Sequence, residues 1–181
     1  MINIIKARLL KGVAAKKIKQ ETFSGGYESC GNELKKTIIK KFGRSLHIRQ
    51  VDTGSCGACV SEIIACSNPV YDIQRFGINF VASPRHADCL LVTGPVSRNM
   101  TMALKSTYEA MPEPKFVITL GDCSLDGGLF KESYYIPGPV KSIVPVALHI
   151  PGCPPEPETI IKSLLAFLTV SSRPVLKNNF F

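Results

Sequence analysis

Four cysteines of this chain have the residue type and the spacing of a metal-binding site. Cys56 and Cys59 lie in V-D-T-G-S-C-G-A-C, Cys123 lies in L-G-D-C, and Cys153 lies in I-P-G-C-P-P. Thiolate sulfur is a soft ligand that suits zinc and iron–sulfur clusters. Two cysteines separated by two residues can bind one centre from a single turn, whereas the other two must come from separate loops. The sequence therefore predicts a four-thiolate centre, provided that the fold brings these loops together.

Strand patterns precede three of these cysteines, because each follows an apolar run that ends at a glycine-containing turn. The predicted strands are 46–51, 78–82, 88–92, 116–120 and 143–150, and the predicted helices are 4–19, 33–42, 59–66, 99–111 and 158–170. Residues 22–31 and 124–142 are glycine-rich and are expected to be loops. Strands that alternate with helices predict an α/β fold with a doubly wound, mostly parallel sheet. Ligands of such sheets bind beyond the carboxyl ends of the strands, where Cys56, Cys123 and Cys153 are expected.

The charge of the chain is concentrated at its N-terminus. Residues 1–50 contain twelve Lys or Arg and three Glu, although the whole chain of 181 residues has a net charge of only +8. We therefore expect a basic N-terminal extension over 1–44, a folded domain over 45–170 and a C-terminal tail over 171–181. The extension is either a solvated arm or a docking arm for an acidic partner or an anionic membrane surface. We expect neither a secretion signal nor a membrane-spanning segment.

Zinc is the alternative to an iron–sulfur cluster at the four thiolates. Zinc sites commonly pair two C-x-x-C turns, whereas here one such pair is joined by two single cysteines from distant loops. This spacing favours a cluster and leaves zinc open. Seven cysteines without a secretion signal favour metal binding over disulfides. The other three cysteines, Cys30, Cys66 and Cys89, are interpreted as ordinary free cysteines, with Cys89 in the core.

Three carboxylates flank the predicted cysteine loops, namely Asp52, Glu62 and Asp122. Glu62 follows Cys59 by three residues, which places it about one helical turn further along the predicted helix. A carboxylate beside a redox centre can act as a proton relay, and the alternative is a solvated or capping side chain. Glu62 is therefore a candidate for proton transfer, and both interpretations remain open.

Several motifs of this chain resemble one known family, over about residues 41–169. They are R-F-G (75–77), A-S-P-R-H-A-D (82–88), L-V-T-G (91–94), M-P-E-P-K (111–115), G-D-C-S-L-D-G-G (121–128) and I-V-P-V-A-L-H-I-P-G-C-P-P-E-P (143–157). These motifs are similar to those of the 20-kDa, or B, subunit of complex I and of the small subunits of nickel–iron hydrogenases. The resemblance implies a flavodoxin-like domain with one 4Fe–4S cluster, bound here by Cys56, Cys59, Cys123 and Cys153.

The resemblance also implies a function within a larger complex. Members of the family pass electrons from an iron–sulfur partner, such as a ferredoxin-like subunit, to a large subunit that holds a quinone pocket or a nickel–iron centre. The spacing C-G-A-C and the phrase S-P-R-H-A-D resemble the membrane-bound, energy-converting hydrogenases, including formate hydrogenlyase. We therefore expect a hydrogenase electron-transfer subunit that lies peripherally on the cytoplasmic side of the cell membrane, beside membrane subunits of its complex.

Two other functions remain as alternatives. The first is the B subunit of a complex I-like NADH:quinone oxidoreductase that delivers electrons to quinone. The second is a zinc-bound structural or nucleic-acid-binding module, which only the thiolates and the basic charge support. No nucleic-acid partner is expected, because the sequence lacks a helix-turn-helix or zinc-finger pattern and the basic arm has few aromatic residues.

Overall fold

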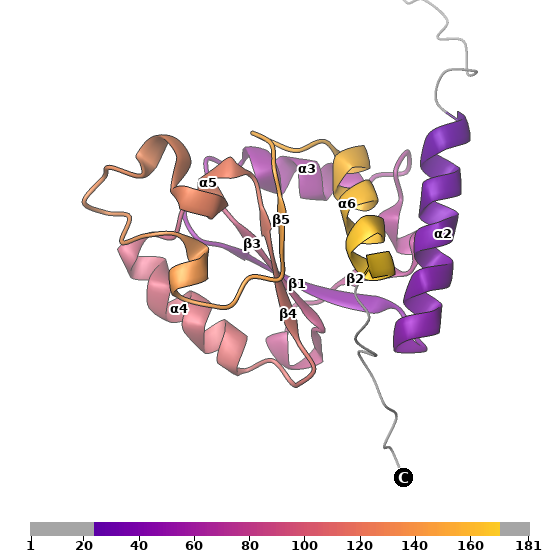
Figure 1. Cartoon of the computed structure of the whole chain (residues 1–181), viewed down its shortest axis with the longest axis horizontal. Coiled ribbons are helices and arrows are strands. Elements are labelled where there is room, and N and C mark those ends of the chain that lie inside the picture. Colours follow the sequence, from indigo (N-terminus) through magenta and orange to yellow (C-terminus); the bar gives the residue numbers. More distant parts are fainter. Residues whose placement is uncertain (1–23, 171–181) are drawn as a thin grey trace, which may run out of the picture.

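A five-stranded parallel sheet forms the centre of the protein (Figure 1). The computed structural model describes residues 24–170. The strands are β1 (Leu46–Asp52), β2 (Ile78–Phe80), β3 (Cys89–Thr93), β4 (Phe116–Leu120) and β5 (Leu148–Ile150). Their spatial order is β2-β1-β3-β4-β5, and every neighbouring pair is parallel. This is the flavodoxin-like order, whose direction reverses between β1 and β3. The predicted fold class is confirmed.

Helices cover both faces of the sheet (Figure 1). The α-helices are α2 (Ser24–Phe42), α3 (Ala58–Cys66), α4 (Arg98–Glu109), α5 (Asp122–Asp126) and α6 (Pro157–Val170), and the 3-10 helices are η2 (Ile73–Phe76), η3 (Pro84–His86), η4 (Gly128–Phe130) and η5 (Val140–Ser142). Helices α2, α3 and α6 pack against one face, and α4 with η5 packs against the other. The two faces therefore have separate hydrophobic cores, one on each side of the sheet.

Strand β3 shows how the sequence builds these two cores, because all five of its residues are buried. Successive side chains of a strand point to opposite faces. Cys89 and Leu91 accordingly pack with α2, α3 and α6, whereas Leu90 and Val92 pack with α4. A continuous apolar run is what a parallel strand buried on both faces requires.

The N-terminal helix is longer than predicted and belongs to the core. Residues 22–31 were expected to be a loop, but α2 begins at Ser24 and runs through these glycines. A side chain at Gly31 would lie 2.3 Å from Phe76, so this glycine serves the close packing of the helix on η2. Leu34, Ile38 and Phe42 of α2 are buried. Within the basic segment expected over 1–44, the residues of α2 therefore belong to the folded domain.

The segment between β4 and β5 also differs from the prediction. Residues 124–142 were expected to be one long loop, and they contain the end of α5 together with η4 and η5. The strand predicted over 143–150 is formed only by Leu148–Ile150. Pro145 lacks the N–H that a strand would use, and Val144 is buried in the core beside α4 instead.

Two predictions, the helix over 4–19 and the tail over 171–181, lie outside the described residues. Between residues 24 and 170, no helix is long and apolar enough to cross a bilayer.

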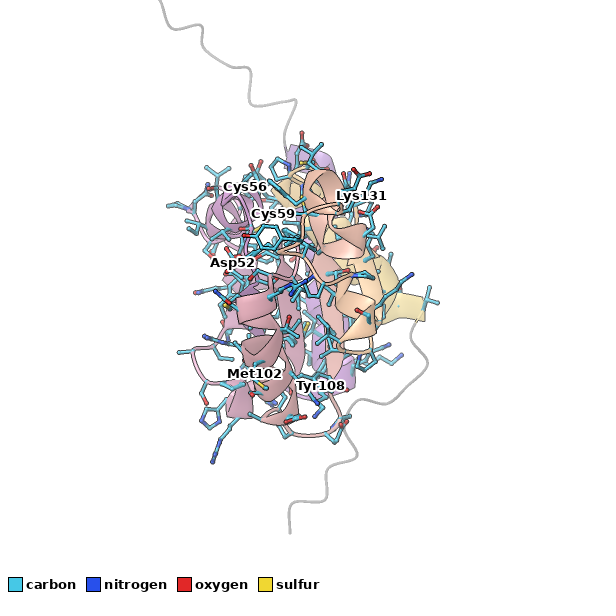
Figure 2. All side chains as sticks on the ribbon, turned by 90° about the vertical axis from the view of Figure 1, so that its left-hand side faces the viewer. Asp52, Cys56, Cys59, Met102, Tyr108 and Lys131 are labelled. Atoms are coloured by element: carbon cyan, nitrogen blue, oxygen red, sulfur yellow. The ribbon has the colours of Figure 1, made fainter. Side chains whose placement is uncertain are left out.

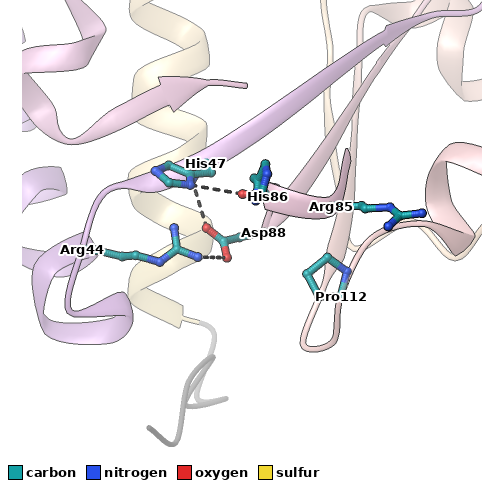
Figure 3. A pocket seen from close by; sticks show the side chains of 6 residues that line it. All are labelled: Arg44, His47, Arg85, His86, Asp88 and Pro112. Atoms are coloured by element: carbon teal, nitrogen blue, oxygen red, sulfur yellow. Dashed lines mark hydrogen bonds and ion pairs between the residues drawn. The ribbon is translucent and has the colours of Figure 1, made fainter. Parts of the chain in front are cut away.

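A buried carboxylate joins the entries of β1 and β3 at the amino edge of the sheet (Figure 3). Asp88 forms an ion pair of 2.7 Å with Arg44 and accepts a hydrogen bond of 3.0 Å from the backbone N–H of His47. His86 contacts the same strand, because its carbonyl oxygen lies 3.1 Å from Nδ1 of His47. These residues line a cavity of about 340 Å³ together with Arg85 and Pro112. The motif S-P-R-H-A-D thus has a structural role far from the cysteines.

Replacing Asp88 by Ala should lower the free energy of unfolding by about 2 kcal/mol, because it leaves the His47 N–H and the Arg44 guanidinium without their acceptor. Chemical denaturation of the full-length protein measures this loss. Glu158→Ala is the control, since its ion pair with Lys162 is exposed and should contribute little to stability. Equal losses in the two variants would contradict the structural role of Asp88.

Candidate functional site

The four predicted cysteines lie on three loops that meet at the carboxyl edge of the sheet. Cys56 and Cys59 follow β1, Cys123 follows β4, and Cys153 follows β5. Figure 2 shows Cys56 and Cys59 together at this end, with Met102 and Tyr108 of α4 toward the opposite end. This edge includes the point between β1 and β3 where the strand order reverses, which is where sheets of this type bind ligands.

Backbone hydrogen bonds tie the Cys123 loop to the Cys153 loop. The N–H of Gly121 donates to the carbonyl of Ile150 over 2.9 Å, which extends the pairing of β4 and β5 by one step. Asp122 and Gly152 then form a reciprocal pair. The N–H of Asp122 donates to the Gly152 carbonyl over 3.0 Å, and the N–H of Gly152 donates to the Asp122 carboxylate over 2.8 Å. Cys123 and Cys153 are therefore held at a fixed separation by their neighbours.

Asp52 shapes the loop that carries Cys56. Its carboxylate accepts hydrogen bonds from the N–H groups of Gly54 and Ser55, at 2.9 and 2.8 Å, and from the Ser55 hydroxyl at 2.7 Å. Burial raises the pKa of Asp52, but these hydrogen bonds outweigh burial, so its pKa lies below the ordinary value. The Ser55 hydroxyl in turn accepts from the N–H of Gly57. The turn before Cys56 is thus fixed by an ionised aspartate.

The four thiols act on one another electrostatically. Burial raises the pKa of Cys59 to about 11, and negative charge on Cys123, Cys56 and Cys153 adds to this shift. Burial also raises the pKa of Cys123, again together with charge on Cys153 and Cys56. Cys59 and Cys123 are half-buried, whereas Cys56 and Cys153 are exposed. Without a cation Cys59 and Cys123 are therefore held as thiols, and a bound metal would displace their protons.

Glycines pack closely against two of the four sulfur atoms. A side chain at Gly121 would lie 2.6 Å from Sγ of Cys59, and one at Gly128 would lie 3.0 Å from Sγ of Cys123. Gly121 also has a φ of +86°, which favours glycine. Neither position can carry a Cβ without displacing a thiol or the backbone. Four thiols at one edge of the sheet, with glycine at the closest contacts, fit an iron–sulfur cluster.

The described residues do not form a preassembled site for a single metal ion. Among residues 24–170, no three His, Cys, Asp or Glu side chains lie close enough to hold one metal ion. A structural zinc site needs four ligands around a single ion at about 2.0–2.3 Å. In a 4Fe–4S cluster each cysteine binds a different iron, so its sulfurs stand further apart. The preference for a cluster therefore rests on the sequence, in which one C-x-x-C pair is joined by two single cysteines.

The remaining cysteines lie elsewhere, as predicted for ordinary free cysteines. Cys66 and Cys89 are buried in the core between the sheet and α3. Burial raises the pKa of Cys66 to about 12 and raises that of Cys89 well above its usual range. Cys30 lies on α2 and is half-buried. The predicted core position of Cys89 is confirmed.

Asp122 is the carboxylate whose charge acts on two of the candidate cysteines, and the sequence did not reveal this interaction. Charge on Asp122 raises the pKa of both Cys59 and Cys123. Glu62 is half-buried on α3 and instead raises the pKa of Cys66, one turn further along the helix. The position of Asp122 immediately before a cysteine was visible in the sequence, but its hydrogen bond to the loop of Cys153 was not.

Asp52→Ala should make an iron-loaded protein lose its iron to a chelator about fivefold faster, because the loop of Cys56 loses a tie worth about 1 kcal/mol. The pKa of Asp52 is lowered in the folded state. The hydrogen bonds of its carboxylate therefore stabilise the loop fully above the unfolded pKa of about 4, and this stabilisation is lost as the pH falls through the lower folded pKa. Wild-type protein should therefore match the variant only in acid. Asn68→Ala is the control, since Asn68 forms a similar turn at the far end of α3. A rate unchanged by Asp52→Ala would contradict this role.

Sequence comparison finds one family over most of the chain. Residues 56–167 match the family described as NADH ubiquinone oxidoreductase, 20 kDa subunit. A probable membrane-bound hydrogenase subunit of Pyrococcus furiosus is 46% identical over 131 residues, which are 72% of this chain and 78% of that protein. Formate hydrogenlyase subunit 7 of Escherichia coli is 44% identical over 68% of this chain and 49% of its own length. The B subunit of an NADH-quinone oxidoreductase from Desulfovibrio desulfuricans is 40% identical, with shares of 70% and 68%.

Solved structures with the same fold also belong to oxidoreductase complexes. A chain of the membrane-bound sulfane sulfur reductase, an archaeal respiratory membrane complex, has a TM-score of 0.62 at 31% identity and covers 77% of this chain and 78% of its own. A chain of an NAD+-reducing NiFe hydrogenase has a TM-score of 0.55, covers 74% and 99%, and at 19% identity shares the fold. The sequence matches at 40% identity or more confirm the resemblance seen in the motifs, and this chain belongs to the NADH ubiquinone oxidoreductase 20-kDa subunit family.

Proposed function

We propose that this chain is the electron-transfer subunit of a membrane-bound hydrogenase. In this proposal Cys56, Cys59, Cys123 and Cys153 bind one 4Fe–4S cluster. The observation that carries it is that four thiols follow three strand ends at one edge of the sheet, with glycines packed against two of the sulfur atoms. When bound, such a cluster accepts and releases one electron at a time. The chain's own residues hold the cluster, exclude water on its inner side and fix its distance from the partners.

An exposed apolar segment beside Cys123 supports docking to a large subunit. Leu129, Phe130 and Tyr134 follow α5 and expose 93%, 47% and 82% of their surfaces. Gly128 at the start of η4 lies against Cys123, so this segment adjoins the proposed cluster. Large apolar side chains grouped at a surface are typical of protein interfaces. A large subunit docked here would lie next to the cluster, as electron transfer requires.

The hydrogenase assignment rests on the first cysteine pair and on the relatives. C-G-A-C resembles the hydrogenase branch, and proteins named as hydrogenase and formate hydrogenlyase subunits are 46% and 44% identical to this chain. In this role the electrons come from a ferredoxin-like iron–sulfur subunit and go to the nickel–iron site. The complex holds the chain peripherally at the cytoplasmic side of the membrane, next to membrane subunits. Similarity to a component of an NADH-quinone oxidoreductase keeps quinone reduction as the second candidate.

Replacing Cys153 by Ala should leave an iron without its protein ligand and reduce the iron and sulfide of the anaerobically purified chain by at least half. The same loss is expected for Cys56, Cys59 and Cys123. Cys89→Ala is the matched control, because this buried thiol lies at the other end of the sheet in β3. Elemental analysis and the visible absorption spectrum measure the result. A full cluster in Cys153→Ala, or one zinc per wild-type chain, would refute the ligand set.

We propose Glu62 as a proton relay near the large subunit, since it lies one turn beyond Cys59 on a helix that begins at the site. Glu62→Gln keeps the shape of the side chain and removes its proton affinity. Turnover of the assembled complex should fall about tenfold or more, whereas reduction of the cluster by dithionite should be unchanged. Glu33→Gln on the exposed surface of α2 is the control. Wild-type turnover in a fully assembled Glu62→Gln complex would assign Glu62 a surface role.

A further inference from the structure

One hydroxyl group near the cysteine loops is buried without a hydrogen-bond partner. Thr93, the last residue of β3, is fully buried, and its Oγ1 has no partner among the described residues. Its carbonyl is bonded normally, because it accepts from the N–H and the hydroxyl of Thr53, both at 2.9 Å. Buried polar side chains nearly always have a partner, and leaving one without a partner is unfavourable. An unpaired hydroxyl at this place therefore requires an explanation.

Thr93 lies between the strands that carry the cysteine loops. It pairs with Asp52, the last residue of β1, and with Leu120, the last residue of β4. The next residue, Gly94, has a φ of +79°, and a side chain there would lie 2.5 Å from the backbone of Ser55 in the Cys56 loop. On the other side, Gly121 follows Leu120 and lies against Sγ of Cys59. The end of β3 is thus enclosed by the loops of the first and third cysteines.

The alternation of β3 places the hydroxyl on the same face as Cys59. Cys89 and Leu91 belong to the core between the sheet and α3, so Thr93 points to that side. Leu120, its partner on β4, belongs to the same core, and Cys59 packs against this core from α3. The hydroxyl therefore lies on the face of the sheet that Cys59 and α3 cover, and it is buried from solvent.

We propose that Thr93 donates a hydrogen bond to a sulfur atom of the bound 4Fe–4S cluster, either an inorganic sulfide or the Cys59 thiolate. This inference rests on the proposed function and assigns a positioning and tuning role to a residue outside the ligand set. The cluster would supply the acceptor that the protein alone does not provide. A hydroxyl donor stabilises the electron-rich reduced state more than the oxidised state, so it raises the reduction potential.

The test compares three variants of the full-length protein. Thr93→Val keeps the shape of the side chain and removes the hydroxyl, whereas Thr93→Ser keeps the hydroxyl. Thr119→Val is the control. Thr119 is also a buried threonine and directly precedes Leu120, the partner of Thr93 on β4, so its side chain points to the opposite face of the sheet. Its hydroxyl already has a partner, because it hydrogen-bonds Nδ1 of His149. Redox titration followed by electron paramagnetic resonance measures the midpoint potential. Electron–nuclear double resonance after exchange into D2O detects the hydroxyl proton at the reduced cluster.

Thr93→Val should shift the midpoint potential to a more negative value and remove one strongly coupled exchangeable proton. Thr93→Ser should restore both, and Thr119→Val should change neither. If Thr93→Val fails to retain a cluster, Thr93→Ala removes the hydroxyl without adding volume and serves as the second variant. A cluster of normal iron content whose potential and exchangeable protons are unchanged in Thr93→Val would overturn this inference alone. A wild-type chain without iron and sulfide would overturn the proposed function as well.

Discussion

The structure depends on one constraint, which is that three loops far apart in the sequence must hold four thiols close together. Like charges on neighbouring thiolates repel, and burial favours the protonated thiol, so the site opposes its own ionised form. A parallel sheet meets this constraint because the carboxyl ends of its strands lie at one edge. The reciprocal hydrogen bonds of Asp122 with Gly152, and the turn formed by Asp52, then fix the loops.

The two edges of the sheet have different roles, because the amino edge stabilises the fold and the carboxyl edge carries the candidate site. At the amino edge, Asp88 joins β1 to β3 through an ion pair and a backbone hydrogen bond, and this arrangement needs no ligand. At the carboxyl edge, glycines pack against two of the sulfur atoms, two thiols are exposed and the Thr93 hydroxyl has no partner among the described residues. Such incomplete bonding is unfavourable in the chain by itself, and it becomes understandable when a cofactor supplies the missing contacts.

Much of the fold could be predicted because its signals are local. The buried run of β4 between Lys115 and Gly121 predicted that strand at its observed bounds, and the alternation of strands and helices predicted the doubly wound parallel sheet. The helical start of α2 was missed because Gly31 indicates a turn, whereas its true role is contact with Phe76 of η2. The short length of β5 was missed because the apolar residue Val144 was counted as part of the strand, whereas it packs in the core beside α4. The candidate site was predicted from cysteines at strand ends and stays a prediction, whereas the hydrogen bonds of Asp122 and the unpaired hydroxyl of Thr93 depend on tertiary contacts.

The central claim is that the four thiols of these three loops bind one iron–sulfur cluster. A crystal structure of the anaerobically purified protein, with anomalous diffraction data on both sides of the iron absorption edge, tests it most directly. The account predicts compact iron density at the carboxyl edge of the sheet, bonded to the sulfur atoms of Cys56, Cys59, Cys123 and Cys153. Iron density that contacts another set of residues, or a lone zinc ion at these cysteines, would contradict it.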